Sequence, residues 1–309
     1  MNSSDLVNLM LSPQWVAKLL HHFISGVRHV NLQGVKTEYI GPQKVKELCP
    51  IIELSGPRFP VLGALWQPRG GTARHDAVAW GYARACSDMG MDIIQQCEVT
   101  SVTQANGKVT GLQTTKGSLK CKKLGIVVAG NSGHLADMAG FRLPLESVSL
   151  QALVSEPIKP CMDVVVMANT VHGYMSQSDK GEMVMGGDLD GYNSYAQRGN
   201  LPTLQHVLTE GIAMFPFLSK LKMLRTWGGI MDMSMDGSPI IDKTHIEGLY
   251  LNCGWCYGGF KATPASGWTF AHTIAQDRVH ELNAGYSLNR FHTGHLIDEK
   301  GLGTKTWIS

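Results

Sequence analysis

Hydrophobic and polar positions follow two different rhythms along the chain, and each rhythm predicts a different kind of sheet. From residue 147 to residue 190 the rhythm has a period of two, which is typical of antiparallel strands with one buried face. Residues 123–129 are instead a continuous apolar run, which predicts a strand buried on both faces in a parallel sheet. The antiparallel strands are expected at 150–155, 163–168, 172–178 and 182–187, with a hairpin turn at 179–181.

Helices are predicted where the apolar spacing lengthens and where proline or glycine ends the segment. Residues 76–89 carry small or apolar side chains on most faces, among them Ala77, Trp80 and Ala83, so a well-buried helix is expected there. Other helices are expected at 13–28, within 41–50, and at 201–215 and 265–276. The remaining strands are expected at 58–66, 91–100, 109–115, 117–122, 223–231 and 248–252.

The order of these elements predicts a mixed α/β (α+β) fold. An α/β stretch comes first, an antiparallel stretch follows, and an α/β stretch returns towards the C-terminus. Such an order is expected for two domains whose segments interleave along the chain, with a ligand bound between them.

Composition and charge narrow the classes of function. The chain has 309 residues, of which 43% are apolar and 17% are charged, as in a folded globular protein. The net charge of +2 gives no strong attraction to nucleic acid or to an acidic membrane surface, so neither partner is expected. The 7 cysteines have irregular spacings that indicate no disulfide framework. Residues 1–16 lack a signal-peptide pattern and no run approaches ~20 apolar residues, so a cytoplasmic protein is expected.

The segment 248–267, GLYLNCGWCYGGFKATPASG, is the strongest candidate for a binding site. Its pattern is a strand, then clustered glycines, then a helix. Glycine lets the backbone lie flat against a large planar ligand, and a helix N-terminus offers free N–H groups to an anion or an electron-rich ring atom. By itself the pattern is about as compatible with a structural turn between core elements.

Within this segment, Cys253 and Cys256 form a C-x-x-C sequence like that of a dithiol redox site. Such a site needs a helix that begins at the first cysteine, whereas here glycines and Lys261 separate the pair from the next helix, so a dithiol role is not expected. A zinc site is not expected either, because no second ligand pair is evident. The histidines at 134, 206 and 272 show no metal-ligand spacing.

Four long motifs carry a resemblance that spans residues 9–300. The segment DGSPIIDKTHIEGLYLNCGWCYGGFKATPASG resembles the C-terminal flavin-binding signature of the D-amino-acid-oxidase-like superfamily. Within that superfamily the chain is most similar to the β subunits of heterotetrameric sarcosine oxidases. The other motifs are RGGTARHDAVAWGYARA, SQSDKGEMVMGGDLDGYNSYAQRGN and LRTWGGIMDMSMDGSPI.

The resemblance implies a Rossmann-like FAD-binding domain interleaved with an antiparallel-sheet substrate domain. No G-x-G-x-x-G fingerprint is present, and the family carries it in an N-terminal βαβ unit, so Met1 is expected to fall after that unit and to leave a remnant of the FAD domain. The implied domains are 1–65 with 146–227 for the substrate, 66–145 with 228–278 for FAD, and a tail at 279–309.

The resemblance also implies two flavins, a noncovalent FAD that accepts electrons from the substrate amine and a covalent FMN that passes them to oxygen. The family pattern puts the covalent bond on His75, in the sequence Ala-Arg-His-Asp. A neutral imidazole can attack the flavin, and both the helix start and Arg74 favour the negative charge that develops. By itself, a histidine beside Arg and Asp is more often an ordinary polar residue at a helix start. Lys220 and Lys222 resemble a basic position suited to the FMN phosphate, although a solvated surface pair is equally compatible.

Two residues are candidates for catalysis. Lys261 resembles a lysine near the flavin, where a cation stabilises negative charge, and its alternative is a surface lysine on a turn. His172 is expected on a strand of the substrate sheet, where a core or rim histidine is the commoner outcome. The resemblance further implies FAD contacts, which simple packing could also explain at the first two, at Val99, Gly130, Gly254, Cys256, Gly258 and Gly259.

The implied reaction is oxidative demethylation of sarcosine to glycine, with hydrogen peroxide as the reduced product. The one-carbon unit leaves as formaldehyde or is captured by tetrahydrofolate, and the implied partners are α, γ and δ subunits. Two alternatives stay open. One is oxidation of another secondary amine, such as dimethylglycine, proline or an opine. The other is an inactive, truncated chain that only scaffolds partner subunits.

Overall fold

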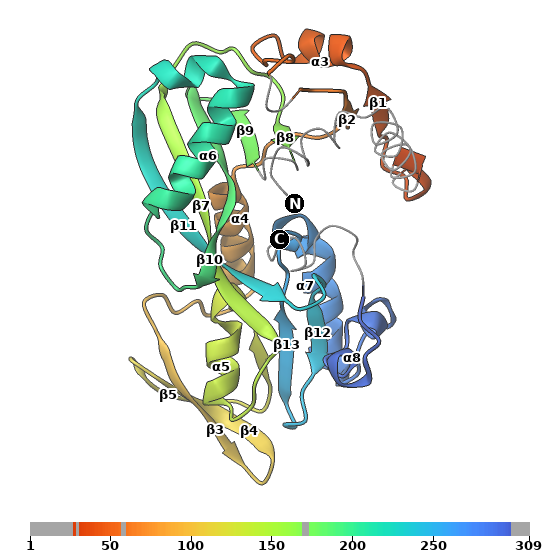
Figure 1. Cartoon of the computed structure of the whole chain (residues 1–309). Coiled ribbons are helices and arrows are strands. Elements are labelled where there is room, and N and C mark those ends of the chain that lie inside the picture. Colours follow the sequence, from red (N-terminus) through yellow and green to blue (C-terminus); the bar gives the residue numbers. More distant parts are fainter. Residues whose placement is uncertain (1–26, 29–30, 57–59, 169–172, 298–309) are drawn as a thin grey trace, which may run out of the picture. The chain divides into compact units, whose positions relative to one another are not determined.

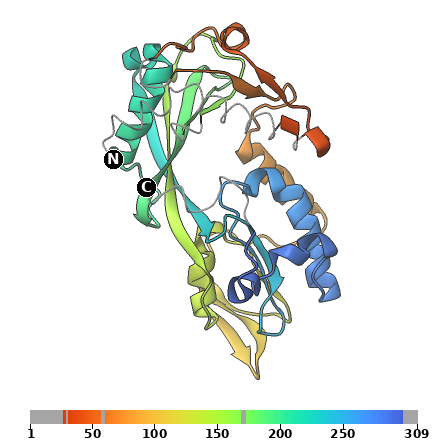
Figure 2. The same ribbon diagram turned by 45° about the vertical axis from the view of Figure 1, so that its right-hand side comes forward.

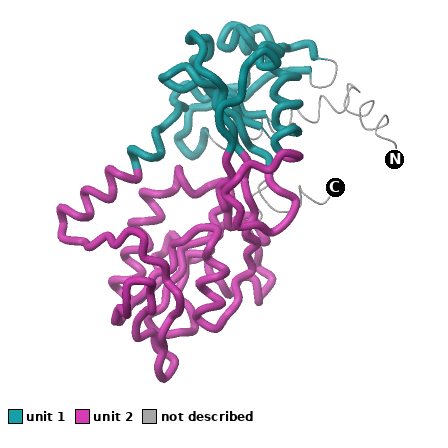
Figure 3. The backbone as a smooth tube through the Cα atoms, turned by 90° about the vertical axis from the view of Figure 1, so that its left-hand side faces the viewer, with its two compact units in different colours: residues 1–78, 152–188, 204–226 teal, residues 79–151, 189–203, 227–309 magenta. Residues whose placement is uncertain are grey.

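The computed structural model describes residues 27–28, 31–56, 60–168 and 173–297. His172 and most of the helix expected at 13–28 lie outside these described residues. The chain divides into two compact units, each assembled from three segments (Figure 3). Unit 1 comprises residues 1–78, 152–188 and 204–226, and unit 2 comprises residues 79–151, 189–203 and 227–309.

The core of unit 1 contains strands of a five-stranded sheet with the order β11-β7-β10-β9-β8, and the strands β7, β10 and β11 each continue into segments of unit 2. Strand β9 pairs antiparallel with both β8 and β10, as the alternating pattern predicted. The turn between β9 and β10 has Gly181 at a φ of +100°, in the left-handed region that favours glycine. The strands are β7 Leu145–Pro157, β8 Val166–Ala168, β9 Gly173–Gln177, β10 Glu182–Asn193 and β11 Met223–Ser234; β1 Glu38–Ile40 and β2 Ala64–Trp66 form a separate pair.

Helix α6 (Leu201–Met214) covers one face of this sheet (Figures 1 and 2). A Cβ atom on Gly211 of the helix would lie 3.6 Å from the sulfur of Met185 on β10, so the two elements are in close contact. The core between them is apolar, and Leu153, Met183 and Phe215 are at most 1% exposed. Burial of such side chains is the main contribution to the stability of this unit.

Unit 2 contains a three-stranded sheet with the order β12-β13-β6 and a separate antiparallel meander, β3-β4-β5. Strand β6 pairs parallel with β13, so the prediction of a parallel strand is confirmed. Helix α7 packs along β12 and β13 (Figure 1). The strands are β3 Val99–Ala105, β4 Lys108–Thr114, β5 Gly117–Lys120, β6 Leu124–Ile126, β12 Ile240–Lys243 and β13 Leu249–Cys253.

The helices of the described residues vary in length from one turn to five. The α-helices are α3 Pro42–Leu48, α4 His75–Asp88, α5 Ser132–Met138, α6 Leu201–Met214, α7 Gly259–Gln276 and α8 Arg290–Thr293, and the 3-10 helices are η1 Ala129–Asn131, η3 Pro216–Lys220 and η4 Glu281–Tyr286. Within the described part of the chain, no helix combines the length and the apolar character that crossing a bilayer requires.

Two predictions about burial are wrong. Helix α4 buries no side chain, and its Trp80 is 57% exposed. Small residues on every face define no apolar stripe, so composition gave no direction in which the helix could pack. Val127, in the run expected to be buried on both faces, is also 57% exposed. The buried part of the run lies in β6, where Ile126 is 3% exposed, and Val127 lies beyond the end of that strand.

Two predictions about element boundaries are also wrong. The strand expected at 91–100 begins only at Val99, because residues 91–95 have no ladder partner among the described residues, and a strand needs a neighbour for its backbone groups. Helix α7 begins at Gly259 rather than after Pro264, which lies inside it. Proline lacks an N–H but is tolerated near a helix start, so it was a poor marker of the first residue.

Candidate functional site

The loop between β13 and α7, residues 254–258, has a backbone shaped by glycine. Gly254 has a φ of +71°, and Cys256 has a φ of +48°, both in the left-handed region. A Cβ atom on Gly254 would lie 3.1 Å from a methyl carbon of Leu145. A larger residue at position 254 would therefore be strained in its backbone and crowded by its neighbour.

A buried carboxylate lies behind this loop and accepts its backbone N–H groups. Asp232, on β11, is 4% exposed, and its Oδ2 accepts a hydrogen bond of 2.5 Å from the N–H of Gly254. The backbone oxygen of Asp232 accepts the N–H of Cys256 at 3.2 Å, and the Trp255 N–H also donates to this residue. Burial raises the pKa of Asp232, while the hydrogen bond from Gly254 opposes the rise.

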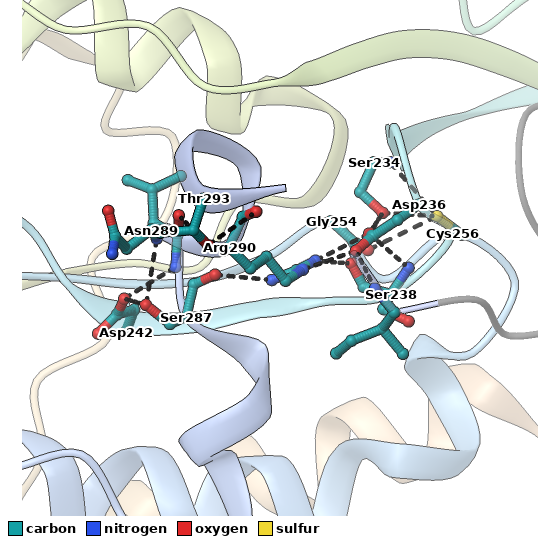
Figure 4. A network of polar contacts seen from close by, with 12 residues as sticks. Ser234, Asp236, Ser238, Asp242, Gly254, Cys256, Ser287, Asn289, Arg290 and Thr293 are labelled. Carbon is teal, nitrogen blue, oxygen red and sulfur yellow. Dashed lines mark hydrogen bonds and ion pairs between the residues drawn. The ribbon is translucent and has the colours of Figure 1, made fainter. Parts of the chain in front are cut away.

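Ser234, two residues further along β11, connects the same loop to a neighbouring turn. Its N–H donates to the sulfur of Cys256 at 3.4 Å, and its hydroxyl donates to the backbone oxygen of Ser238 at 2.8 Å. Successive odd or even residues of a strand point to the same face, which explains why Asp232 and Ser234 act on one loop. These contacts fix the loop to the end of β11 (Figure 4).

The turn after β11 is held by a buried ion pair between Asp236 and Arg290 (Figure 4). The guanidinium donates to both carboxylate oxygens, at 2.7 and 2.9 Å, and to the backbone oxygen of Ser238 at 2.8 Å. Burial opposes ionisation of Asp236, but hydrogen bonds from Arg290 and Ile297 outweigh it and lower the pKa of this carboxyl group. The bidentate geometry is the strong form of such a pair.

The first turn of α7 presents backbone donors at the end of the loop. The first hydrogen bond of the helix runs from the N–H of Ala262 to the oxygen of Gly258, at 3.3 Å. The N–H groups of Gly259, Phe260 and Lys261 precede that bond and point out of the helix end. No acidic residue lies in this turn, and the Lys261 ammonium, which donates to the Tyr257 oxygen at 3.1 Å, adds positive charge. The helix end therefore suits an anion or an electron-rich ring atom.

These residues fit an FAD molecule. A Cβ atom on Gly259 would lie 3.3 Å from the Cβ of Trp255, so glycine keeps the backbone open where a side chain would be crowded. The N–H groups of Gly259 and Lys261 would hold the flavin, whereas the Gly258 N–H already donates to the Trp255 oxygen at 2.8 Å. The bound group would supply two-electron redox chemistry. The groups that the helix start offers to a ligand are N–H donors and not carboxylates. The nearby carboxylate of Asp232 is instead bound to the loop backbone at Gly254.

Cys253, at the end of β13, and Cys256, in the loop, are not a reactive dithiol pair. Cys253 is 0% exposed and Cys256 is 9% exposed. Burial raises the pKa of both thiols, and the nearby Asp232 raises that of Cys253 further. A reactive cysteine needs the opposite, an accessible thiol with a lowered pKa.

His75 is the first residue of α4, and its side chain is exposed. Arg74 lies directly before it and forms an ion pair of 2.8 Å with Asp76. Both partners are about half exposed or more, at 61% and 49% of their side chains. A hydrogen bond from Arg74 lowers the pKa of Asp76 to about 2. The exposed imidazole of His75 is thus accessible for covalent bonding to a ligand, and the neighbouring Arg74 supplies a positive charge.

The other predicted site residues are distributed over both units. Val99 is the first residue of β3, and Gly130 lies in η1, where an added Cβ atom would clash with Ile230 at 2.2 Å. Lys220 ends η3, and Lys222 follows it with its N–H donating to Glu156 at 2.9 Å. In unit 2 the structure joins Gly254, Cys256, Gly258, Gly259 and Lys261 in one loop and helix start. His172 lies outside the described residues.

Sequence reasoning missed the support behind the loop, namely Asp232, Ser234 and Arg290. A signal was present for the first, because Asp232 interrupts the apolar residues Ile230, Met231 and Met233 at the end of a strand. The predicted strand ended at Met231, one residue before Asp232, whereas β11 extends to Ser234. Over the described ranges, no group of three His, Cys, Asp or Glu side chains could hold a metal ion.

Comparisons with known proteins show the family of the chain. The family model described as FAD dependent oxidoreductase matches residues 16–273. The chain is 56% identical over 304 residues to a protein of Rhodobacter capsulatus, and 53% identical over 304 residues to one of Rhizobium meliloti, both named sarcosine oxidase subunit beta. Each alignment covers 96% of this chain and 73% of the relative.

A solved structure extends the likeness to the fold. L-proline dehydrogenase from P. horikoshii superimposes with a TM-score of 0.83 at 25% identity, over 91% of this chain and 75% of that one. The expected mixed α/β fold is confirmed by this match and by the sheets described above. The chain belongs to the FAD dependent oxidoreductase family, in the group of the sarcosine oxidase β subunits.

Proposed function

We propose that this chain is the β subunit of a heterotetrameric oxidase that demethylates sarcosine. In the overall reaction, sarcosine, dioxygen and water give glycine, formaldehyde and hydrogen peroxide. The observation that carries the proposal is the identity of more than half of all aligned positions with two proteins named sarcosine oxidase subunit beta. The partners proposed with it are α, γ and δ subunits, and tetrahydrofolate in the α subunit is the alternative acceptor of the one-carbon unit.

The glycine loop is the proposed site of the noncovalent FAD. Support comes from the free N–H groups at the start of α7 and from the positive φ of Gly254. The Lys261 ammonium would stabilise negative charge that develops next to the helix start. Val99 and Gly130 are proposed as further contacts to the same group.

His75 is the proposed attachment point of a covalent FMN. Its exposed imidazole stands at the N-terminus of α4, where the helix field favours negative charge. Arg74 supplies a cation next to it, and Lys220 and Lys222 are proposed as phosphate contacts. His172 is proposed as a catalytic residue on sequence grounds alone, since it lies outside the described residues.

A second candidate is oxidation of another secondary amine. The match to L-proline dehydrogenase favours it, because the ring nitrogen of proline is also a secondary amine and the fold agreement covers 91% of the chain. Dimethylglycine and opines are further secondary or tertiary amines that the proposed second activity includes.

The test uses the chain purified in complex with its partner subunits. Hydrogen peroxide release is measured with sarcosine, dimethylglycine, L-proline and an opine, and sarcosine is expected to have the highest kcat/KM. A different preferred amine would support the second candidate. No turnover with any amine, in a complex without yellow colour, would indicate an inactive scaffold.

The covalent flavin is tested by intact mass. The wild-type chain is expected to carry an increase equal to one FMN, and His75→Ala is expected to abolish it. His134→Ala is the matched control, because His134 is also an exposed histidine in the first turn of a helix, α5. An unmodified wild-type chain in the assembled complex would contradict the assignment of His75.

A further inference from the structure

We infer that Asp232 is a positioning residue for the flavin, which fixes the glycine loop and lowers the midpoint potential of the FAD held there. The inference deepens the proposed function and rests on it. The observations that carry it are the burial of the carboxylate and its hydrogen bonds to the loop.

Asp232 binds the first part of the loop, residues 254–256. It accepts the N–H groups of Gly254, Trp255 and Cys256, three consecutive donors. Because those donors are directed back to Asp232, the loop turns the following donors, of Gly259, Phe260 and Lys261, towards its open end. The carboxylate thus holds the N–H groups of Gly254 and Trp255, while the backbone oxygen of Asp232 holds that of Cys256, so these three donors are not available for the flavin.

The position of Asp232 is itself held firmly. Ser234 binds the sulfur of Cys256 from the same face of β11, and the ion pair of Asp236 with Arg290 fixes the turn that follows. The end of β11 that carries Asp232 is therefore held in place by contacts to the loop and to the following turn. A group with such support can hold its partner to within a fraction of an ångström.

The hydrogen bonds that shape the loop do not require a charged acceptor at position 232. Among the described residues no lysine, arginine or histidine forms an ion pair with it, and backbone N–H groups alone stabilise the carboxylate. Burying a carboxylate without a cation is costly, and an asparagine oxygen could accept the Gly254 N–H without that cost. The negative charge is therefore expected to act on whatever the loop binds.

A fixed negative charge behind the loop that would bind the flavin disfavours the addition of further negative charge to that flavin. In a poorly screened interior this effect extends over several ångströms. Asp232 is expected to keep the midpoint potential of the FAD low, while the Lys261 ammonium acts in the opposite direction. The loop would thus balance one buried anion against one exposed cation.

Two variants separate charge from shape. Asp232→Asn keeps an acceptor for the Gly254 N–H and removes the charge, so the midpoint potential is expected to rise while the affinity for FAD stays within a few-fold. Asp232→Ala removes the acceptor, and the Kd for FAD is expected to rise about tenfold or more. Both are measured on the assembled complex, by dye-equilibration potentiometry and by titration of the flavin-depleted complex with FAD.

Asp242→Asn is the matched control. Asp242 lies in the same unit and also accepts backbone N–H groups, from Lys243 at 2.7 Å and Leu288 at 2.8 Å, but it has no hydrogen bond to the glycine loop among the described residues. A general loss of structure would affect this control as well, whereas a specific role of Asp232 leaves its flavin potential and FAD affinity unchanged.

The outcomes are distinct. A wild-type complex that binds no FAD overturns the proposed function and this inference together. A wild-type complex that binds FAD, with an unchanged potential in Asp232→Asn and an unchanged affinity in Asp232→Ala, overturns the inference alone. A potential that shifts equally in Asp242→Asn also overturns it, because the shift would then be a general consequence of losing a carboxylate.

Discussion

The helices α4 and α7 both begin at a proposed flavin site, yet the chain supports them very differently. Helix α7 buries Thr269, Phe270 and Thr273, and the loop before it is tied to Asp232. Helix α4 buries no side chain, and the contact next to His75 is an exposed ion pair. The difference indicates that the glycine loop is preorganised by contacts within this chain, whereas the proposed attachment point at His75 has no comparable support among the described residues.

The largest predicted effect tests the support of the α7 loop. Arg290→Ala leaves the carboxylate of Asp236 buried and unpaired, so the free energy of unfolding is expected to fall by about 3–5 kcal/mol. Urea denaturation of the purified protein measures the change. A loss no larger than that of an exposed substitution would show that the ion pair does not brace the loop.

A smaller effect is expected at Gly130, in the turn before α5. A Cβ atom there would lie 2.2 Å from Cγ2 of Ile230, so Gly130→Ala is expected to destabilise the protein by about 1–3 kcal/mol through overpacking. Gly133→Ala is the control, because nothing lies within 4 Å of its added Cβ atom. Equal melting temperatures for the two variants would contradict the tight packing.

The C-terminal end of α7 gives a pH-dependent effect. The hydroxyl of Tyr250 donates to Asp277 at 2.7 Å, and burial followed by this hydrogen bond raises the pKa of Tyr250 to about 12. Since the folded-state pKa is raised, the contribution to stability is present below about pH 10 and is lost as the pH rises towards 12.

Tyr250→Phe is therefore expected to cost about 1 kcal/mol at pH 8, and the difference from wild type should shrink above pH 10. Denaturation at several pH values measures it, together with the absorbance of tyrosinate. A constant difference up to pH 12 would mean that the hydroxyl titrates normally.

The smallest effect is expected at α4. Arg74→Gln removes an exposed ion pair, so the melting temperature should not change measurably, while covalent flavin incorporation at His75 should fall. Intact mass and thermal denaturation of the same sample separate the two. A clear loss of stability would remove the contrast between the helices.

The sequence was sufficient for elements whose pattern is set by local periodicity. The bounds of β9 and of the hairpin of β4 and β5 were predicted closely, whereas β10 begins at Glu182 as predicted but extends to Asn193, six residues beyond its predicted end. The start of α7 was not, because Pro264 is tolerated inside the helix and its tolerance depends on neighbours. The strand expected at 91–100 failed for a similar reason, since pairing requires a partner that residue patterns do not specify.

The candidate site divides in the same way. The glycines and Lys261 stand in one continuous motif, so sequence brought them together correctly. Asp232 and Arg290 come from segments 22 residues before Gly254 and 54 residues after Asp236, respectively. Long-range hydrogen bonds of this kind leave no periodic signal, and only the folded structure reveals that these side chains meet.

The deep burial of Cys253 and Cys256 has a consequence for durability. Peroxide oxidises thiolates far faster than thiols, and an oxidised cysteine would add bulk and charge beneath the loop. Because burial keeps both thiols protonated, hydrogen peroxide released by the proposed reaction is expected to oxidise them slowly and to leave the glycine loop intact over many turnovers.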